Sequence, residues 1–413
     1  MKRVVISTAR RHTQPDEVSG NVYLVDAETG CVLQRSAMIE PPYRAEDTNP
    51  RGGMRGCKGI SIREDQIAIA NSAAVFRYDP QWNLLGMISH PSCSAIHDIA
   101  FQGDTLWVTS ARTDVLMQFD LFGELLQHYY LRNPSPALSK LGWRPPVLLP
   151  DEHIRQGKID FRNPLTHDQE SYDRAHLNSL CFLSNGEMLV SLGQVIGSEQ
   201  AFLLQLKGRL IRLGLWPLFL SFNRAIGSLL RKPKDLHSNL VVRPGKSLSA
   251  VVRISPAGRH TLSLAIPDVS TPSHSLLALP DDSVVYLNTS AGTVLHFDPQ
   301  SGTVISTTKV TDGFLRGAAM LSENTVLLGS KGELIVFGLD TQRIASTYRL
   351  TDDPNEAVYD IKVFPEHYAD LPASFEEHFE RSAGCGAAEL IKTGRKLQAR
   401  DAVGANAEFT DTI

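Results

Sequence analysis

Three histidines recur at similar places in the 413-residue chain, each at or near the start of a short apolar run. They are His97 in HDIAF, His176 in HLNSL and His274 in HSLLAL. Imidazole is a common ligand of divalent transition metals, and it is also the side chain most used for proton transfer near neutral pH. The three residues are therefore candidate catalytic groups if the fold brings their segments together.

Other polar residues hold the same place when the apolar runs are aligned. They are Lys58 in KGISI, Asn178 in the run of the second histidine, Arg316 in RGAAM, and Tyr359 or Asp360 in YDIKV. If these groups meet inside the protein, several donors and cations would be buried without partners, at a cost of a few kcal/mol each. An anion, a metal ion or both would satisfy them, so these five residues are candidate substrate-binding groups.

Two further arginines are candidates for the same role. Arg55 lies in the glycine-rich stretch NPRGGMRGCKG, whose backbone amides could bind an anion, although the glycines could equally serve only the turn. Arg112, in SARTD, follows a later apolar run and could face either the site or solvent.

Two chemistries fit the three histidines. In the first, His97, His176 and His274 bind one divalent metal ion and leave positions open for water or substrate, while Asp98 or Asp360 orients a ligand or completes the ligand set. In the second no metal is bound, one histidine acts as nucleophile or general base, and the others clamp an anionic group together with an arginine. The spacing of the histidines does not decide between them.

The elements that must position these residues repeat along the chain. Units of four short β-rich runs begin at Lys58, His97, His274 and Leu315, with a loose period of roughly 40 residues, which is typical of propeller blades. A fifth unit is interrupted: HLNSLCFLSNGEMLVSLGQ supplies two strands and SAVVRISPAGRHTLSLA supplies the other two. A sixth is split between the chain ends, with AVYDIKVF as its inner strand and RVVISTA, GNVYLVDA and CVLQRSA as its outer three.

Joining the first and last segments in one sheet closes a ring and removes open edges. The sequence therefore predicts an all-β protein, a six-bladed β-propeller over residues 1–365, closed by N- and C-terminal strands in one blade. The first strand of every blade lines the central channel of a propeller, so the aligned polar residues should converge there.

Two segments lie outside the repeat. Residues 197–247 predict a helical insertion within one blade, and the stretch 201–234 carries no acidic residue. This insertion could be a lid packed on the propeller, or a basic amphipathic contact with a membrane surface or a protein partner. Residues 366–413 predict one C-terminal helix followed by a flexible tail.

Composition narrows the class of protein. The net charge of −4 gives no argument for nucleic-acid binding, and the five cysteines, with no C-x-x-C pair, do not indicate a disulfide framework or a thiolate zinc site. No secretory signal pattern or membrane-spanning stretch is visible, which favours a cytoplasmic protein, with peripheral membrane attachment as the variant. The absence of GxGxxG, P-loop and GxSxG motifs argues against nucleotide-binding and serine-hydrolase sites.

Several motifs, taken in order, resemble a family of bacterial propellers of unknown function. They are HDIA, WRPP, HLNSL, SHSLLAL, FLRGAA and VYDIKVFP. More weakly, HDI at 97–99, HLNS at 176–179 and HSLLALPDD at 274–282 are similar to the arylsulfate sulfotransferases, six-bladed propellers that move a sulfuryl group through a histidine. That likeness implies His274 as the nucleophile, with His97, His176 and Asn178 binding the sulfuryl oxygens.

The sequence thus predicts a propeller enzyme with an axial pocket for a small anionic or aromatic substrate. Histidine-based group transfer is the first hypothesis. A metal-dependent hydrolase, lyase or oxygenase with a three-histidine site is the alternative. A non-catalytic propeller that binds a partner or a membrane through its insertion is the third.

Overall fold

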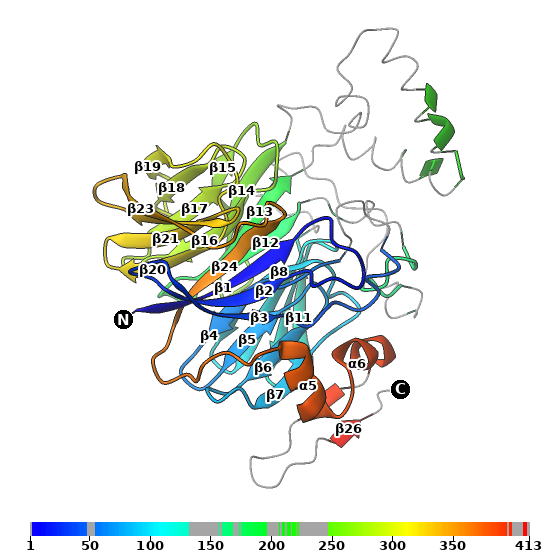
Figure 1. Ribbon diagram of the computed structural model, residues 1–413. Helices are drawn as coiled ribbons and strands as arrows, with labels where there is room; N and C mark the ends of the chain where they lie inside the picture. The colour runs from blue at the N-terminus through cyan, green and yellow to red at the C-terminus, as the bar shows by residue number, and fades with distance from the viewer. Residues whose placement is uncertain are drawn as a thin grey trace.

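The computed structural model describes most of the chain. The described residues are 2–47, 54–131, 156, 159–167, 173, 175–195, 206, 209–210, 213–215, 217–219, 221–222, 247–394, 396–398 and 408–410. Within them, six antiparallel sheets are arranged in a ring, as Figure 1 shows. The protein is a six-bladed β-propeller, and this prediction from the sequence is confirmed.

One blade combines both ends of the chain and is called the closing blade here. Its strands, from the axis outward, are β24 (Glu356–Phe364), β1 (Arg3–Arg10), β2 (Asn21–Asp26) and β3 (Val32–Ala37). Strand β24 pairs antiparallel with β1 along its whole length, from Arg3 opposite Phe364 to Arg10 opposite Glu356. The predicted split of this blade is confirmed strand by strand.

The other five blades each use four strands that are consecutive in sequence, and all run from an inner to an outer strand. Their bounds are β4 (Ile60–Ile62), β5 (Ile67–Ala70), β6 (Val75–Tyr78) and β7 (Leu84–Ile88); β8 (Ile96–Gln102), β9 (Thr105–Ser110), β10 (Val115–Asp120) and β11 (Leu125–Tyr130); β12 (Leu177–Phe182), β13 (Met188–Val195), β14 (Leu248–Ile254) and β15 (His260–Ile266); β16 (His274–Ala278), β17 (Val284–Asn288), β18 (Thr293–Phe297) and β19 (Val304–Lys309); β20 (Ala318–Ser322), β21 (Thr325–Ser330), β22 (Glu333–Gly338) and β23 (Arg343–Arg349).

The inner strands contact one another all the way round the ring, in the order β24, β4, β8, β12, β16, β20 and back to β24. Apolar side chains of adjacent blades pack between the sheets, for example Leu177 and Val190 with Leu116 of the preceding blade. Burial of these faces holds the blades together, and it leaves the starts of the six inner strands gathered around one axis.

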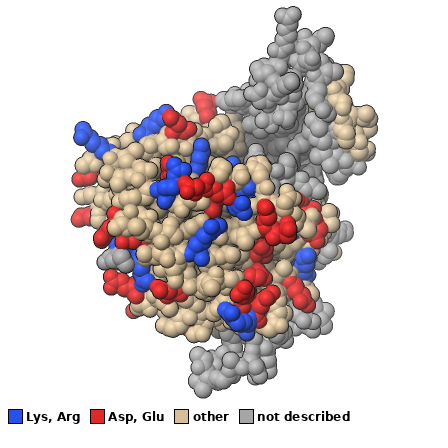
Figure 2. Space-filling view, in the orientation of Figure 1, with Lys and Arg blue, Asp and Glu red and all other residues tan. Residues whose placement is uncertain are grey.

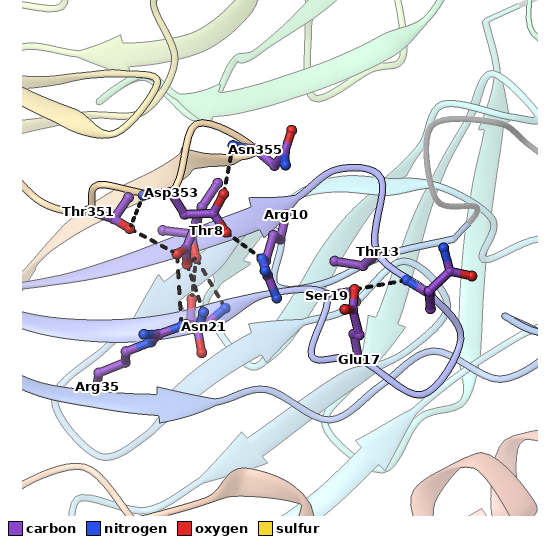
Figure 3. Close-up of polar contacts among 12 residues, drawn as sticks. Thr8, Arg10, Thr13, Glu17, Ser19, Asn21, Arg35, Thr351, Asp353 and Asn355 are labelled. Carbon is purple, nitrogen blue, oxygen red and sulfur yellow. Dashed lines mark hydrogen bonds and ion pairs between the residues drawn. The ribbon is translucent and has the colours of Figure 1, made fainter.

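A buried carboxylate joins the two chain ends in the closing blade. Glu356, which is 1% exposed, accepts hydrogen bonds from Thr8 Oγ1 at 2.5 Å, Asn21 Nδ2 at 2.7 Å and Tyr23 OH at 3.1 Å. Thr351 Oγ1 donates a fourth at 3.2 Å. Figure 3 shows Thr8, Asn21 and Thr351 gathered at this junction. The carboxylate therefore ties strands from the start of the chain to the strand that ends the ring.

The C-terminal segment differs from the single helix that the sequence predicts. It forms two helices, α5 (Phe375–Ala383) and α6 (Ala387–Thr393), because Gly384 adopts a left-handed conformation (φ 75°) and its N–H caps α5 by donating to Glu380 O. Phe375 and Phe379 pack on the aromatic residues of the blade β4–β7. Two short strands, β25 (Lys396–Gln398) and β26 (Glu408–Thr410), extend that blade at its outer edge.

The predicted insertion lies mostly outside the described residues. Those described within 197–247 include helical positions at 217–219 and 221–222, as expected. Whether the segment is a lid or a membrane or protein contact stays a prediction. Across the described part of the chain, no helix combines the length and apolar character that a membrane span requires.

Removal of the Glu356 carboxylate should weaken the closure of the ring. In Glu356→Ala, three buried donors lose their acceptor, so we expect the free energy of unfolding to fall by about 2–4 kcal/mol. Urea denaturation followed by circular dichroism measures the change. Glu333→Ala, which removes a half-exposed carboxylate paired with Arg349, is the matched control and should cost no more than about 0.5 kcal/mol. Equal losses in the two variants would contradict this role of Glu356.

Candidate functional site

The predicted axial residues meet at the start of the inner strands. One cavity of about 20 Å³ on the axis is lined, among others, by His97, Asn178, His274, Arg316, Tyr359 and Asp360. About 10–15 Å³ suffices for one water molecule, so the enclosed part of the cavity takes only a small group of a ligand. His176, with a side chain 26% exposed, lies beside it, with its ring centroid 4.9 Å from that of His97.

The three histidines come from the blades of β8, β12 and β16, which are consecutive around the ring. Their candidate ligand nitrogens all lie within 4.8 Å of one another. The ring centroids of His97 and His274 are 5.8 Å apart, and those of His176 and His274 are 6.3 Å apart. His176 adopts a left-handed backbone conformation (φ 49°), which is uncommon for a residue with a side chain and is often found at functional sites.

Each of the three imidazoles has an oxygen partner at Nδ1. His97 Nδ1 donates to Ala95 O at 2.8 Å, and His176 Nδ1 donates to Asp173 Oδ2 at 2.8 Å. His274 Nδ1 lies 3.1 Å from Thr289 Oγ1, whose own hydroxyl proton goes to Leu315 O. The histidine must therefore be the donor in this pair. All three rings thus carry their proton on Nδ1 when neutral, which leaves Nε2 with a free lone pair.

Burial favours the neutral form of two of these rings, those of His97 and His274. The pKa values of His97 and His274 are well below the ordinary value, first because burial disfavours the charged form and then because of neighbouring positive groups such as Arg316. Neutral imidazole is the form that binds metals. Asp173 and Thr289, which fix the rings, were not among the residues predicted from the sequence. For Asp173, the D-x-x-H spacing to His176 was a local signal in the sequence. The sequence contained no comparable signal for Thr289.

Two cations flank the histidines. The Arg316 guanidinium carbon lies 3.3 Å from the centroid of the Tyr359 ring, and Lys58 Nζ lies 4.3 Å from the same centroid. Both cations are more than nine-tenths buried. Burial lowers the pKa of Arg316 to about 10, and burial together with the charges of Arg316 and Arg55 lowers that of Lys58 well below its usual range. The predicted residues Lys58, Arg316 and Tyr359 are thus brought together with His97, whose ring centroid is 5.7 Å from that of Tyr359.

Several polar atoms that face this cavity have no hydrogen-bond partner among the described residues. They are Asn178 Oδ1, Ser179 Oγ, Arg316 Nη2 and Tyr359 OH. Unsatisfied buried polar atoms are rare in folded proteins, and a cluster of them indicates a site for a ligand or ordered water.

The two axial aspartates have their oxygens engaged between blades. Asp98 Oδ2 accepts from Leu180 N of the next blade at 3.1 Å, and Asp360 Oδ2 accepts from Ile60 N of the next blade at 2.9 Å. Asp360 Oδ1 also pairs with Lys362 Nζ at 3.0 Å. These contacts give both carboxylates a positional role, and the prediction that they orient a ligand stays a prediction.

The two outlying arginines differ in their position. Arg55 is near enough to influence the pKa of both Lys58 and Tyr359, so it belongs to the same electrostatic environment. Arg112 lies in the turn between β9 and β10 and does not line the cavity described above. Its role in substrate binding stays a prediction.

A glycine of the second strand supports the site. An ideal Cβ on Gly193 would lie 2.0 Å from Asn178 Nδ2 and 2.7 Å from Ser273 O. Asn178 Nδ2 itself donates to Ser273 O, which identifies the amide nitrogen and leaves Oδ1 toward the cavity. Any side chain at position 193 would displace Asn178, so the glycine is required by the position of the amide.

Comparisons with known proteins add little to this geometry. No family model matches the sequence, and no curated protein does. Among solved structures, similar ones are a protein of unknown function from Bacteroides caccae (8% identity, 88% of this chain and 99% of that one, TM-score 0.49) and a nidogen/laminin complex (7%, 87% and 98%, 0.48). Virginiamycin B lyase from Staphylococcus aureus is a third (9%, 73% and 72%, 0.42). All three TM-scores are below 0.5, so these likenesses show neither a family nor an activity, and the expected link to sulfotransferases is not shown.

Substitution of Gly193 should disturb the site through Asn178. We expect Gly193→Ala to lower the free energy of unfolding by about 1–3 kcal/mol, because its Cβ overlaps the Asn178 amide. In the double variant with Asn178→Ala, the overlap with the amide is removed, so the loss should be smaller than the sum of the two single losses. Chemical denaturation of the four proteins measures this coupling.

Gly386→Ala is the control for the glycine itself. Its added Cβ would meet only the Glu380 carboxylate, at 3.4 Å. Its stability should therefore stay within about 0.5 kcal/mol of the parent protein. Strict additivity of Gly193→Ala and Asn178→Ala would rule out the proposed contact.

Proposed function

We propose that the protein is a metal-dependent enzyme in which Nε2 of His97, His176 and His274 binds one divalent transition metal ion next to a small anionic substrate. The observation that carries this proposal is the shared arrangement of the three rings. Each has its Nδ1 proton directed to an oxygen, and the candidate ligand atoms lie within 4.8 Å of one another.

The ligand set supports Lewis-acid chemistry. Three neutral imidazoles do not neutralise the charge of a divalent ion. They also leave coordination positions free for water and substrate. An ion bound in this way supplies an activated water or a polarised substrate oxygen, which suits hydrolysis or a lyase reaction. The oxygen partners at Nδ1 would hold each ring in place, as they do in many metal sites with histidine ligands.

The chain's own residues would bind the substrate. Arg316 and Lys58 both lie against the Tyr359 ring, and both side chains are buried. Positively charged groups in this position favour an anionic substrate. Asn178, held by Ser273 O, offers an acceptor for a substrate hydroxyl or amine.

A second candidate is the metal-free transfer reaction that the sulfotransferase likeness implies. It is supported by His274, whose Nε2 lone pair is free because Nδ1 is the donor to Thr289. In this alternative His274 would attack the transferred group, while the remaining histidines and Arg316 would stabilise its oxygens. The two candidates differ in their requirement for a metal ion.

Metal analysis separates them. We expect the protein, freed of metal with a chelator and titrated with zinc, manganese, cobalt or nickel salts, to bind about one equivalent of at least one of these ions. His97→Ala, His176→Ala and His274→Ala should each abolish tight binding, and Asp173→Asn should weaken it about 10–100-fold. Calorimetry and elemental analysis provide the measurement.

Asp298→Asn is the matched control for Asp173→Asn, because Asp298 is in the turn between β18 and β19, where it accepts from Gln300 N, and it does not line the axial cavity. It should bind metal like the parent protein. If none of the four ions binds, the metal-dependent proposal is wrong. A covalently modified His274, trapped from an activated aryl sulfate, would then support transfer.

The insertion supports a further candidate, contact with an anionic membrane surface. Among its described residues, Leu213, Leu218 and Phe222 are each about two-thirds exposed. The stretch 201–234 has basic residues and no acidic one, a composition that favours anionic lipid headgroups.

Sedimentation with lipid vesicles tests this candidate. We expect the protein to bind vesicles that contain phosphatidylserine, and binding should decrease with added salt and be absent on pure phosphatidylcholine. Leu218→Asp with Phe222→Asp should reduce the bound fraction several-fold. Phe122→Asp, at an equally exposed phenylalanine on another blade, is the control and should leave it unchanged. Equal binding of all variants would refute the contact.

A further inference from the structure

The cations beside the histidines create an electrostatic problem for a metal site. Arg316 and Lys58 are both buried, and Arg316 Nη2 has no hydrogen-bond partner among the described residues. Asp360, which lines the same cavity, already accepts from Ile60 N, Ile361 N and Lys362 Nζ. Asp98, which also lines the cavity, accepts from Ile99 N and Leu180 N. Among the described residues no ion pair joins either carboxylate to Arg316, so a buried metal cation would face the positive charge of Arg316. An anion bound between them would remove this repulsion.

The size and shape of the cavity limit this anion. The space of about 20 Å³ takes only a group of a few atoms. The Arg316 guanidinium carbon lies 3.3 Å from the centroid of the Tyr359 ring, and Nη2 is buried without a hydrogen-bond partner among the described residues. A guanidinium can pair with a carboxylate, a phosphate or a sulfate through two hydrogen bonds. Of these three groups the carboxylate is the smallest, so it fits this space best.

The side-chain amide of Asn178 requires a hydrogen-bond donor from the ligand. Its Nδ2 donates to Ser273 O, so the buried Oδ1 that lines the same cavity is an acceptor without a donor. A ligand with only carboxylate oxygens would leave it unsatisfied, at a cost in binding. A hydroxyl or amino group next to the carboxylate would satisfy it.

We infer that the substrate is a small carboxylate with an adjacent hydroxyl or amino group, and that it binds cooperatively with the metal by lying between the three-histidine site and Arg316. This inference rests on the proposed function, since it requires the metal site. It adds the substrate class and a thermodynamic coupling. The anion increases metal affinity, and by linkage the metal increases anion affinity by the same factor.

The coupling is measured by calorimetry with zinc as the metal and glycolate as the probe, or with the ion that binds best in the metal analysis. In saturating glycolate, the dissociation constant of the metal should fall about tenfold or more. The reverse titration, glycolate into protein with and without metal, should give the same factor. Comparison of variants under identical conditions cancels the weak binding of glycolate to free metal.

Arg316→Gln should change metal binding differently in the absence and in the presence of glycolate. Without anion, this variant should bind metal more tightly than the parent protein, because a like charge has been removed. Its metal affinity should no longer respond to glycolate. Arg343→Gln, an exposed arginine of β23, is the matched control and should behave as the parent protein in both titrations.

Asn178→Ala tests the hydroxyl or amino group of the ligand. This test does not depend on whether the arginine variant folds. The parent protein should respond more strongly to glycolate than to acetate, and the variant should respond equally to both. Sulfate that matches or exceeds glycolate in the parent protein would overturn the carboxylate assignment. Metal binding without any glycolate effect would overturn the inference alone, whereas the absence of metal binding would overturn the proposed function.

Discussion

The pairing of β24 with β1 is the interaction on which the rest of the structure depends. It places the last blade strand of the chain against the first, so that the closing blade gains its inner strand and six sheets form a closed ring. Glu356 reinforces this junction with hydrogen bonds from both ends of the chain. Tyr359 is three residues further along the same strand, so the closure that stabilises the ring also completes the axial site.

The ring imposes a second constraint, which is electrostatic. Six strands that start around one axis bring their first side chains into a small space, and here these are mostly imidazoles and cations. Burial first, and then mutual repulsion, lowers the pKa values of His97, His274 and Lys58. The fold could have placed apolar residues at these positions at lower cost. The retention of so many unsatisfied donors at one place is the physical basis for proposing a ligand.

Much of this arrangement follows from the sequence because it is local and repeated. The four-strand units, the interrupted blade and the split closing blade are all visible as short apolar runs, and alignment of those runs finds His97, His274, Arg316 and Tyr359. The missed features depend on contacts between distant segments or on single backbone angles. Thr289, which contacts His274, directly follows β17, the strand that pairs with β16. The need for Gly193 arises from the close approach of Asn178. Gly384 divides the terminal helix through its left-handed conformation. A pattern of hydrophobicity contains no information on such contacts.

The order of the blades gives the axial site a direction. The histidines belong to β8, β12 and β16, which are neighbours, whereas Lys58, Arg316 and Tyr359 belong to the blades of β4, β20 and β24, which make up the opposite half of the ring. The channel therefore has an imidazole side and a cationic side that face each other across the axis. A molecule with two chemically different ends would therefore bind in one orientation only. A protein with the histidines and the cations exchanged between the two halves of the ring would bind it in the reverse orientation.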